Sequence, residues 1–485
     1  MEIEEVKAKV YIRADGDEKI GLGHLIRCIA LGKMLAAHFD IYFFCFKCPI
    51  SVAEEIKNSG FHFYQIDKEE VFIEKLEGNE IVVLDHYELD SSYQKEIISK
   101  SCKLVCIDDV HDKYFYSDLI INTAPGISST NYKVARYTQF AIGMDYALLR
   151  PSFLNAKNDL KKVEKSVLVC FGGSDHENLT QRTVNILKKD TRFSLVNVVV
   201  GVSYKALEDL EKDIKSDDRF RLSISLDESQ MKEIIHDSDL AIVPSSGILI
   251  EVLALNTRAI SGFYAQNQIN VYNSLRKMGA FISAKNFSID SIKDAIDIYF
   301  SKSLKPIPSI IDGKSGERIL TCFKQLEIEK EVSLKMATLE DLDITYHWAS
   351  DKRLREFFFN SNPIGFEEHR SWFLNKIQDE GCLYFIGYLK EKPFGSVRFD
   401  VSGSEALISF LVDPFYHSKG LGTIILKSGV ELLADYDLDL KVIRAEVFSE
   451  NIASMKVFKK LGYSQKISDK NDKIYEFEKY LNTYA

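Results

Sequence analysis

The chain of 485 residues lacks the features of several large classes of protein. It begins Met-Glu-Ile-Glu-Glu, without the cationic residues that open a signal peptide. No apolar run reaches the ~18 residues that a membrane span needs. The net charge of -10 argues against nonspecific binding of nucleic acid. We therefore expect a cytoplasmic protein that acts without nucleic acid and without a membrane.

The eight cysteines do not form a disulfide framework. Cys102, Cys106 and Cys170 lie in apolar, strand-like runs, where a buried reduced thiol is expected. Cys45 and Cys48 form a C-x-x-C motif, so zinc is an alternative. A closed zinc site needs four ligands, and no second pair follows at finger-like spacing. We predict core cysteines and no metal.

Short apolar strands alternate with amphipathic helices in the first half of the chain. The predicted strands cover residues 8–13, 41–46, 81–85, 104–108 and 119–122. The predicted helices between them cover residues 24–37, 51–59 and 91–100. This alternation predicts a parallel sheet with crossover helices, and ligands of such sheets lie beyond the carboxyl ends of the strands.

The loop after the first predicted strand reads Gly21-Leu22-Gly23-His24 and opens a helix. Gly21 and Gly23 let the backbone approach a ligand, and the helix N-terminus offers free N–H groups and a positive dipole. His24 is positioned to polarise a water or a leaving group near neutral pH. A tight turn with an uninvolved histidine is the alternative interpretation.

Polar clusters follow two other strands of this predicted sheet. Asp85-His86-Tyr87 ends one strand, and Asp108-Asp109, with His111 shortly after, ends another. Each cluster is also typical of a turn, where aspartate is common. Because strand ends of a parallel sheet meet at one edge, we expect these clusters and the glycine–histidine loop to face one cleft.

A second alternating unit begins near Ser166, with strands predicted over residues 167–171, 195–200, 240–243 and 259–263, and polar clusters follow its strands as well. Ser246-Gly247 opens a helix and so makes an anion site. Glu251 on that helix can chelate the vicinal hydroxyls of a ribose; an N-cap serine and a surface glutamate are the alternatives. With Gly172-Gly173 and Gln266-Asn267-Gln268 at other strand ends, the pattern predicts a pocket for a nucleoside diphosphate.

These motifs resemble the two-domain glycosyltransferase B architecture and, within it, the UDP-sugar hydrolases of the pseudaminic acid pathway. The matching stretches run in the family's order between residues 1 and 326; they are 12–15, 21–27, 84–87, 107–109, 146–151, 171–175 and 312–319. The resemblance implies two Rossmann-like α/β domains in a glycosyltransferase B arrangement, over residues 1–150 and 151–328. It also implies inverting hydrolysis of UDP-2,4-diacetamido-2,4,6-trideoxy-β-L-altropyranose to the free sugar and UDP.

The same resemblance implies roles for single residues. His24 falls on the family's proposed catalytic histidine and would orient or deprotonate the water, while Asp15 and Tyr87 would contact the sugar. The other expected substrate-binding residues are Gly21, Gly23, Gly173, Ser246, Gly247, Glu251, Gln266 and Asn267. Helix dipoles and backbone N–H groups neutralise the leaving diphosphate in this scheme, so it requires no metal.

The pattern changes near residue 320. The charged segment 325–331 is interpreted as a linker or a helix end, and a new domain is predicted over residues 332–485. Within it, an apolar strand over 406–412 runs into a loop with Gly420 and Gly422 and then into an apolar helix. This order is typical of a pyrophosphate-binding loop.

The last region resembles the GNAT N-acetyltransferases, which are α/β proteins that use acetyl-CoA. The matching motifs are His417-Ser-Lys-Gly-Leu-Gly422 and the block 446–463, and the likeness is closest to the sugar-nucleotide 4-amino acetyltransferase of the same pathway. It implies acetyl-CoA as co-substrate and Glu446 as a base that acts through water. The residues expected to bind CoA are Leu411, Val412, His417, Lys419, Gly420, Leu421, Gly422, Asn451 and Ser454.

Two residues depart from the GNAT pattern. His417 stands where arginine or glutamine is usual, so its charge near pH 7 is weaker. Phe458 stands where many relatives carry the tyrosine that protonates the leaving thiolate, and a phenylalanine cannot donate a proton. Water, Tyr463 or Tyr416 are alternative donors, and a domain that binds CoA without turnover is the second interpretation.

The two predicted activities fit one reaction sequence. Acetylation of the 4-amino group yields the diacetamido UDP-sugar that the hydrolase consumes, and tethering raises the local substrate concentration without a tunnel. The expected partners are therefore UDP-sugars and acetyl-CoA, and a homodimer is left open. The alternative for the first half is a glycosyltransferase, which would release the sugar only when an acceptor is added.

Overall fold

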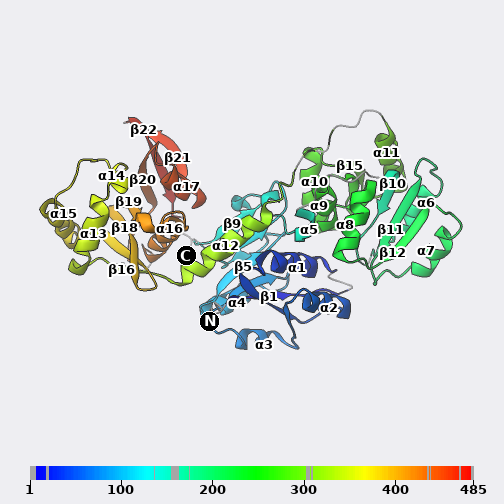
Figure 1. The fold of residues 1–485 in the computed structure, drawn as a ribbon, viewed down its shortest axis with the longest axis horizontal. Coiled ribbons are helices and arrows are strands. Elements are labelled where there is room, and N and C mark those ends of the chain that lie inside the picture. The colour runs from blue at the N-terminus through cyan, green and yellow to red at the C-terminus, as the bar shows by residue number, and fades with distance from the viewer. Residues whose placement is uncertain are drawn as a thin grey trace, which may run out of the picture. The chain divides into compact units, whose positions relative to one another are not determined.

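The computed structural model of the protein describes residues 7–17, 21–135, 137–154, 163–173, 175–301, 306, 308, 310–433, 436, 438–468 and 471–481. Ser174, within the matching stretch 171–175, lies outside these residues. The chain divides into two compact units, Met1–Phe323 and Lys324–Ala485. The first unit holds two large parallel sheets and a two-stranded parallel sheet of β6 (Tyr114–Phe115) and β8 (Lys133–Val134), and the second unit holds one mixed sheet (Figure 1).

The first sheet has the strand order β3-β2-β1-β4-β5-β7-β9, and all of its neighbouring strands are parallel. Its strands are β1 (Ala8–Ala14), β2 (Phe39–Cys45), β3 (His62–Gln65), β4 (Ile81–Asp85), β5 (Lys103–Ile107), β7 (Leu119–Asn122) and β9 (Gln139–Ile142). The crossover helices are α1 (Gly23–Leu35), α2 (Ile50–Asn58), α3 (Glu69–Glu74) and α4 (Ser91–Ser99). All five residues of β4 are buried, which is typical of a strand covered on both faces.

The second sheet has the order β12-β11-β10-β13-β14-β15 and is also parallel. Its strands are β10 (Val163–Val169), β11 (Leu195–Val200), β12 (Phe220–Ile224), β13 (Ser238–Pro244), β14 (Arg258–Gly262) and β15 (Ile282–Lys285). One face packs against α6 (Leu179–Leu187), α7 (Leu207–Ile214) and α11 (Ile289–Phe300). The opposite face packs against α5 (Pro151–Leu154), α8 (Glu228–Asp237), α9 (Gly247–Ala254) and α10 (Ile269–Lys277) (Figure 1).

The parallel sheets predicted from the alternating pattern are therefore confirmed. The strands predicted over 119–122 and 195–200 have those bounds, whereas the strand predicted over 167–171 runs from Val163 to Val169. That strand ends early because the chain turns at Gly172, whose φ is 88°. The C-x-x-C cysteines and the other six are free thiols, and Cys102, Cys106 and Cys170 are buried as predicted.

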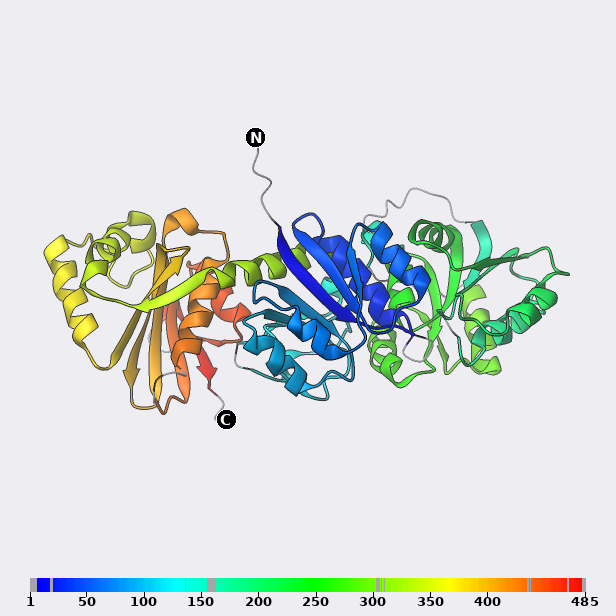
Figure 2. The ribbon, with the colours of Figure 1, turned by 90° about the horizontal axis from the view of Figure 1, so that it is seen from below.

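The sheet of the second unit has the order β16-β17-β18-β19-β20-β22-β21. Its strands are β16 (Val332–Met336), β17 (Cys382–Leu389), β18 (Lys392–Ser402), β19 (Glu405–Val412), β20 (Val442–Phe448), β21 (Ser464–Ser468) and β22 (Asn471–Tyr480). Helices α13 (Leu342–Ser350), α14 (Lys352–Arg355) and α15 (Phe366–Gln378) pack on one face. Helices α16 (Leu421–Leu432) and α17 (Ile452–Lys460) pack on the other (Figure 2).

One of the two interpretations of the charged segment 325–331 is confirmed. The charged segment 325–331 is a helix end, because helix α12 (Ser315–Lys330) continues through it. Its charged positions include Glu329, whose buried carboxylate pairs with Lys427 on α16 at 2.8 Å. After β16 the chain forms a 3-10 turn (Leu339–Asp341) that leads into α13, and Asp341 caps this turn by accepting from the amide of Thr338.

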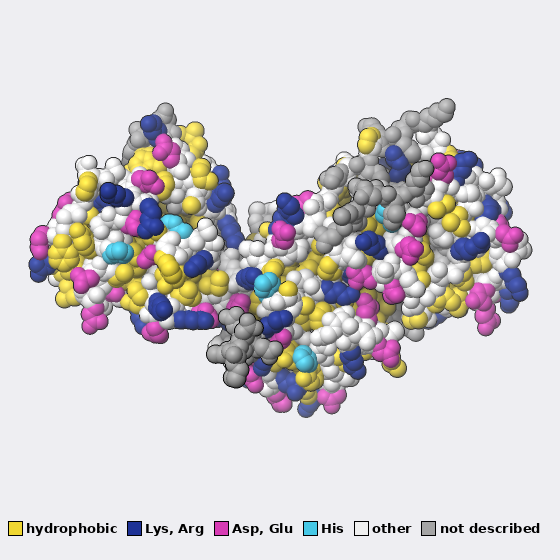
Figure 3. Space-filling model, in the orientation of Figure 1, with side chains coloured by type: hydrophobic (Ala, Val, Ile, Leu, Met, Phe, Trp, Pro, Cys, Tyr) yellow, Lys and Arg dark blue, Asp and Glu magenta, His cyan; other side chains and the backbone are white. Residues whose placement is uncertain are grey.

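Within the described ranges, no helix combines the length and the apolar character needed to cross a membrane. On the face shown in Figure 3, lysine and arginine side chains are interspersed with aspartate and glutamate side chains over both units. This mixture agrees with the small acidic excess of the sequence.

Candidate functional site

A cavity of about 1340 Å³ lies in the first unit. Its wall includes Gly21–His24, at the start of α1, and residues 107–109, at the end of β5. Residues 170–173 after β10 and 245–251 after β13 line it from the second sheet. Strand ends from both sheets therefore meet at this cavity, where ligands of parallel sheets bind.

His24 is the second residue of α1 and is fixed by a carboxylate on the neighbouring strand end. Its Nδ1 lies 2.6 Å from Oδ1 of Asp85, the last residue of β4, and the Asp85 side chain is fully buried. A carboxylate accepts, so Nδ1 carries the proton and the neutral ring keeps a lone pair on Nε2. His24 lines the cavity, and its ring meets that of Tyr87 edge-on at 4.6 Å.

Arg27, one turn later on α1, ties this pair to a second carboxylate. Its Nε donates to Oδ2 of Asp85 at 2.6 Å, and its Nη1 donates to Oδ2 of Asp109 at 3.0 Å. Burial opposes the ionisation of Asp85, but the Arg27 cation and His24 outweigh it and hold the pKa of that carboxyl well below its usual range. Asp85 is therefore ionised at neutral pH and serves as a fixed acceptor for His24.

Tyr87 reaches the same network from the loop after β4. Its hydroxyl donates to Oδ2 of Asp109 at 3.1 Å, and Asn267 of the second sheet lies beside that hydroxyl. Burial and the Asp109 carboxylate raise the pKa of Tyr87 to about 12, so the phenol stays protonated. Tyr87 and Asn267 both line the cavity, as expected of substrate-binding residues.

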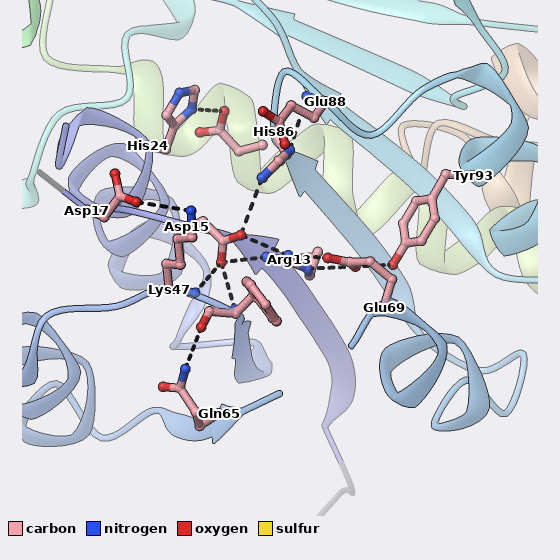
Figure 4. Close-up of polar contacts among 12 residues, drawn as sticks. Arg13, Asp15, Asp17, His24, Lys47, Gln65, Glu69, His86, Glu88 and Tyr93 are labelled. Carbon is pink, nitrogen blue, oxygen red and sulfur yellow. Dashed lines mark hydrogen bonds and ion pairs between the residues drawn. The ribbon is translucent and has the colours of Figure 1, made fainter. Parts of the chain in front are cut away.

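Asp15 does not line the cavity, although it was expected to contact the sugar. Its two oxygens accept from Arg13 at 2.8 and 2.9 Å, and its Oδ1 also accepts from the amides of Phe46 and Lys47 (Figure 4). Burial opposes its ionisation, but His86 and Arg13 hold the pKa of Asp15 well below its usual range. The carboxylate thus joins the ends of β1 and β2 and supports the loop that carries His24.

The second sheet contributes a helix start and a buried carboxylate to the cavity. Ser246 is the N-cap of α9 and makes no capping bond with its side chain, so its hydroxyl stays available to a ligand. Glu251, on the same helix, accepts from Nε and Nη2 of Arg150 through one oxygen, at 3.1 and 2.8 Å. Burial raises the pKa of Glu251, and the Arg150 cation opposes that rise.

The remaining residues predicted in this pocket divide into two groups. Gly21, Gly23, Gly173 and Gly247 line the cavity with their backbones. Gly21 has a φ of 82°, which explains the need for glycine before α1. Gln266 is exposed and outside the cavity wall, whereas its neighbour Gln268 is buried and lines it. Among the described residues, no group of His, Cys, Asp and Glu side chains is arranged to hold a metal ion.

The second unit contains an opening between two strands. Strands β19 and β20 run parallel, but they pair only from Glu405–Val442 to Leu407–Arg444, although both strands continue. Beyond that point the backbone of β19, including Leu411 and Val412, is no longer bonded to β20. A linear ligand can therefore insert between the two strands and bond to β19.

The start of α16 lies in the loop that follows β19. Gly420 is its N-cap with a φ of 79°, and the amides of Leu421 and Gly422 fall in the first turn, where a helix offers them no acceptor. His417, expected at a phosphate, instead has its Nε2 2.9 Å from the carbonyl of Val412 and so closes the loop. The free amides at the mouth of the opening favour a pyrophosphate there.

A model of the acetyltransferase (GNAT) family matches residues 346–463. The C-terminal region has a GNAT acetyltransferase fold. An aminoglycoside acetyltransferase, AAC(6')-Ib, solved in complex with coenzyme A, is 20% identical to this chain. That comparison covers 31% of this chain and 94% of the other, with a TM-score of 0.27.

Two curated relatives extend over the first unit. The UDP-2,4-diacetamido-2,4,6-trideoxy-beta-L-altropyranose hydrolase of Campylobacter jejuni is 25% identical, over 57% of this chain and 99% of its own length. An uncharacterized protein of Methanocaldococcus jannaschii, MJ1062, is 25% identical over 96% of this chain and 99% of its own length. The N-terminal half is thus related to hydrolases of sugar biosynthesis.

Within the GNAT domain, the predicted base and the predicted CoA-binding asparagine differ in their surroundings: the first is exposed on a strand and the second caps a helix. Glu446 is exposed on β20, on the face opposite the core residues Ala445 and Val447. Asn451 is the N-cap of α17, and its side-chain oxygen accepts from the amide of Ser454 at 3.0 Å. That oxygen is therefore engaged by the helix, which leaves the amide NH2 for a ligand.

Phe458 and Tyr463, one of the alternative proton donors, both lie in the core of the GNAT domain. Phe458 is buried and stacks on Phe477, so it belongs to the core. Tyr463 packs edge-on against Phe458, and its buried hydroxyl has no hydrogen-bond partner among the residues that the structure describes. Burial raises the pKa of Tyr463 well above its usual value. Tyr463 is thus enclosed in the core of the domain as the structure stands.

The contacts between residues of the first site were not predicted from the sequence, although Asp85 and Asp109 were expected at the cleft as members of strand-end clusters. Asp85, Arg27, Asp109 and Arg150 lie in stretches that match the hydrolase family, but no pattern in the sequence pairs them with one another. Asp85 and His24 are 61 residues apart, and Arg150 and Glu251 are 101 apart. In the sequence, these residues were indicated only by their position, either at a predicted strand end or close to the predicted histidine.

Proposed function

We propose that the first unit hydrolyses a UDP-2,4-diacetamido-2,4,6-trideoxy sugar to the free sugar and UDP. We further propose that the GNAT domain transfers an acetyl group from acetyl-CoA to the 4-amino precursor of that UDP-sugar. The observation that carries the first proposal is the buried Asp85 carboxylate 2.6 Å from Nδ1 of His24 on the cavity wall. A histidine held in this tautomer presents a base to the cavity.

In the proposed hydrolysis, Nε2 of His24 takes a proton from water as the water oxygen bonds to the anomeric carbon. The bond between that carbon and the β-phosphate oxygen breaks, and UDP leaves with the electron pair. Attack on the face opposite the leaving group inverts the anomeric configuration. Asp85 stabilises the imidazolium that forms, and the protonated Tyr87 offers a hydrogen-bond donor close to His24.

The UDP portion fits the part of the cavity lined by the second sheet. The first-turn amides of α9, with Ser246 and Gly247, would accept the diphosphate through their positive helix end. Glu251 uses one carboxylate oxygen for Arg150, so the other is available to the ribose hydroxyls. In this proposal, the first-turn amides and the positive end of α9 neutralise the leaving diphosphate.

In the proposed acetyl transfer, the 4-amino nitrogen attacks the thioester carbon of acetyl-CoA. Glu446 accepts the proton of the amine through a water, and the C–S bond breaks to release the thiolate. The opening between β19 and β20 would hold the pantetheine arm, and the amides of Leu421 and Gly422 would bind the pyrophosphate. With Phe458 in the core, water is the proposed proton donor to the thiolate.

Two separate reactions test these proposals. The wild-type protein is mixed with UDP-2,4-diacetamido-2,4,6-trideoxy-β-L-altropyranose without any acceptor, and NMR follows UDP and the anomer first formed. UDP release with inversion supports the hydrolase, and His24→Ala abolishes it. UDP release only after an acceptor sugar is added would replace the hydrolase with a glycosyltransferase. Thiol release from acetyl-CoA and the 4-amino UDP-sugar, measured with a thiol reagent, tests the acetyltransferase.

A further inference from the structure

The cysteines of the C-x-x-C motif in the first unit, Cys45 and Cys48, are used by no step above. Cys45 is the last residue of β2, Cys48 follows in the loop, and α2 begins at Ile50. Since β2 and β3 are parallel neighbours and α2 joins them, the motif lies at a strand end of a βαβ unit. A C-x-x-C motif in this place is typical of dithiols that are oxidised reversibly.

The two thiols are in contact and differ in exposure. Cys45 is fully buried and Cys48 is partly exposed, and their side chains are hydrogen-bonded to each other. This hydrogen bond lowers the pKa of Cys48 and raises the pKa of Cys45, which burial raises further. The partly exposed thiol is therefore the one that can attack an incoming disulfide, and the buried thiol lies where it can resolve the product.

The two residues between the cysteines hold the end of β1. The amides of Phe46 and Lys47 donate to Oδ1 of Asp15 at 2.7 and 3.0 Å (Figure 4). The carbonyl of Lys47 accepts from the amide of Gly16 at 2.9 Å. Nζ of Lys47 lies 3.2 Å from Oδ2 of Asp17, which lines the cavity. The backbone between the cysteines thus supports the segment that leads from β1 to the cavity.

We propose that Cys45 and Cys48 form a redox-active dithiol, and that its oxidation to a disulfide weakens the support of the segment Gly21–His24 and slows the hydrolase. The dithiol does not depend on the proposed function, whereas its effect on the rate rests on the proposed hydrolysis. A disulfide holds its two Cβ atoms about 3.8 Å apart, so it closes a small ring around the residues between the cysteines. That ring restrains the backbone whose amides hold Asp15.

The effect reaches His24 through the backbone. The carbonyl of Asp17, whose side chain pairs with Lys47, accepts from the amide of Gly21 at 2.9 Å. Gly21 begins the segment that ends at His24 near the start of α1. A change at Lys47 is thereby passed to the residues that position the proposed base.

The proposed oxidation is a thiol–disulfide exchange with a small-molecule disulfide. The Cys48 thiolate attacks one sulfur of that oxidant, which forms a mixed disulfide and releases one thiolate. Cys45 then gives up its proton to water and attacks the Cys48 sulfur, which forms the Cys45–Cys48 disulfide and releases the second thiolate. The electron pair lost by the dithiol is taken up by the small-molecule disulfide, and a dithiol reductant reverses both steps.

The test equilibrates the full chain with mixtures of oxidised and reduced glutathione, alkylates the free thiols and analyses the peptides by mass spectrometry. We expect a Cys45–Cys48 disulfide that forms while the other six cysteines stay reduced, and that dithiothreitol removes. In the oxidised sample, hydrogen exchange at the amides of Phe46 and Lys47 should be faster. The kcat for UDP release should be about tenfold lower, the effect of one lost hydrogen bond to a charged group.

Substitutions of single cysteines assign the effect. Cys48→Ser and Cys48→Ala should keep the kcat of the reduced protein in the presence of oxidised glutathione, because neither can form the disulfide. Cys322→Ser removes another partly exposed thiol and is the matched control. It should lose activity on oxidation as the wild type does. An equal loss of kcat in Cys48→Ser would overturn the proposal, since the oxidation responsible would then lie elsewhere.

The remaining outcomes separate the dithiol from the proposed function. Absence of the Cys45–Cys48 disulfide in excess oxidised glutathione overturns the dithiol. A disulfide that forms with unchanged hydrogen exchange at Phe46 and Lys47 and an unchanged kcat overturns its link to the cavity. A reduced protein that releases no UDP overturns the proposed hydrolase, while the disulfide and the exchange rates still decide whether the dithiol controls this loop.

Discussion

Replacing Asp85 with asparagine removes the charge behind His24 while it keeps the size of the side chain. Asp85 is fully buried and accepts from His24, and Arg27 donates to both of its oxygens. Asparagine has one oxygen and one NH2 group, so its NH2 group cannot accept from Nε of Arg27 as Oδ2 of the carboxylate does, and its oxygen meets His24 without a negative charge. It can also donate to Nδ1, which would move the proton of the imidazole to Nε2 and remove the base from the cavity.

The size of the effect follows from the two interactions that Asp85→Asn loses. A hydrogen bond to a charged group is worth about 1.5–3 kcal/mol, which corresponds to a loss of roughly 10–150-fold in kcat. Arg27 keeps its bond to Asp109 and is partly exposed, so the stability cost lies near the lower end of the ~3–5 kcal/mol for a broken buried pair. Binding of UDP should be unaffected, because Asp85 does not line the cavity.

The assay measures kcat for UDP release, the Kd of UDP and the free energy of unfolding in urea for each variant. Asp118→Asn is the matched control, since Asp118 is a buried carboxylate of the same unit that pairs with Lys103 at 2.7 Å. The control should lose stability but keep its kcat. A kcat of Asp85→Asn within about twofold of wild type would refute the role given to Asp85. A fall in kcat that only matches the fraction of unfolded protein in the sample would refute it too.

Four further predictions follow from the described contacts. Glu251→Gln should raise the Kd of UDP in calorimetry by about tenfold, the effect of one charge-assisted hydrogen bond, with little change in kcat; a lower kcat at an unchanged Kd would contradict the ribose role. Glu446→Gln should slow acetyl transfer by about 10²-fold in the thiol assay and leave the Kd of CoA unchanged; a rate equal to wild type would exclude Glu446 as the base. Lys427→Met should lower the stability of the GNAT domain by about 3 kcal/mol in urea unfolding, because Glu329 is buried beside it, and an unchanged stability would show that the pair is screened. The free energy of unfolding should also fall as the pH decreases below about 4. The folded-state pKa of Asp15 is depressed, so this carboxylate contributes stability above its unfolded-state pKa and loses that contribution in acid. Asp15→Asn should reduce the slope of the unfolding free energy against pH by up to about 1.4 kcal/mol per pH unit, and an unchanged slope would contradict this role of Asp15.

Periodicity and loop composition were sufficient to predict the parallel sheets of the first unit. The strands over 119–122 and 195–200 have the predicted bounds because short β-branched runs between polar turns allow few alternatives. The glycine–histidine loop was recognisable because Gly21 needs a positive φ and His24 begins a helix. These features depend on residues that are neighbours in the sequence.

The hydrogen-bond partners of the predicted site residues could not be predicted from the sequence in the same way. The bond between His24 and Asp85 joins residues 61 apart, and Asp15 turns from the cavity toward Arg13 because of contacts with β2. Asn451 matches a CoA-binding motif, yet the same residue type in the same place also caps a helix, and its oxygen serves the cap. Such outcomes depend on tertiary packing, which a local pattern does not encode.

The measurement that tests the central claim most directly follows the fate of the 4-amino UDP-sugar mixed with the protein and acetyl-CoA. NMR resolves acetylation of the amine and release of UDP in the same sample, and His24→Ala is run in parallel. We expect acetylated free sugar and UDP from the wild type and accumulation of the acetylated UDP-sugar with His24→Ala. Acetylation without UDP release by the wild type would contradict the hydrolase, and UDP release only from a sugar acetylated beforehand would contradict the acetyltransferase.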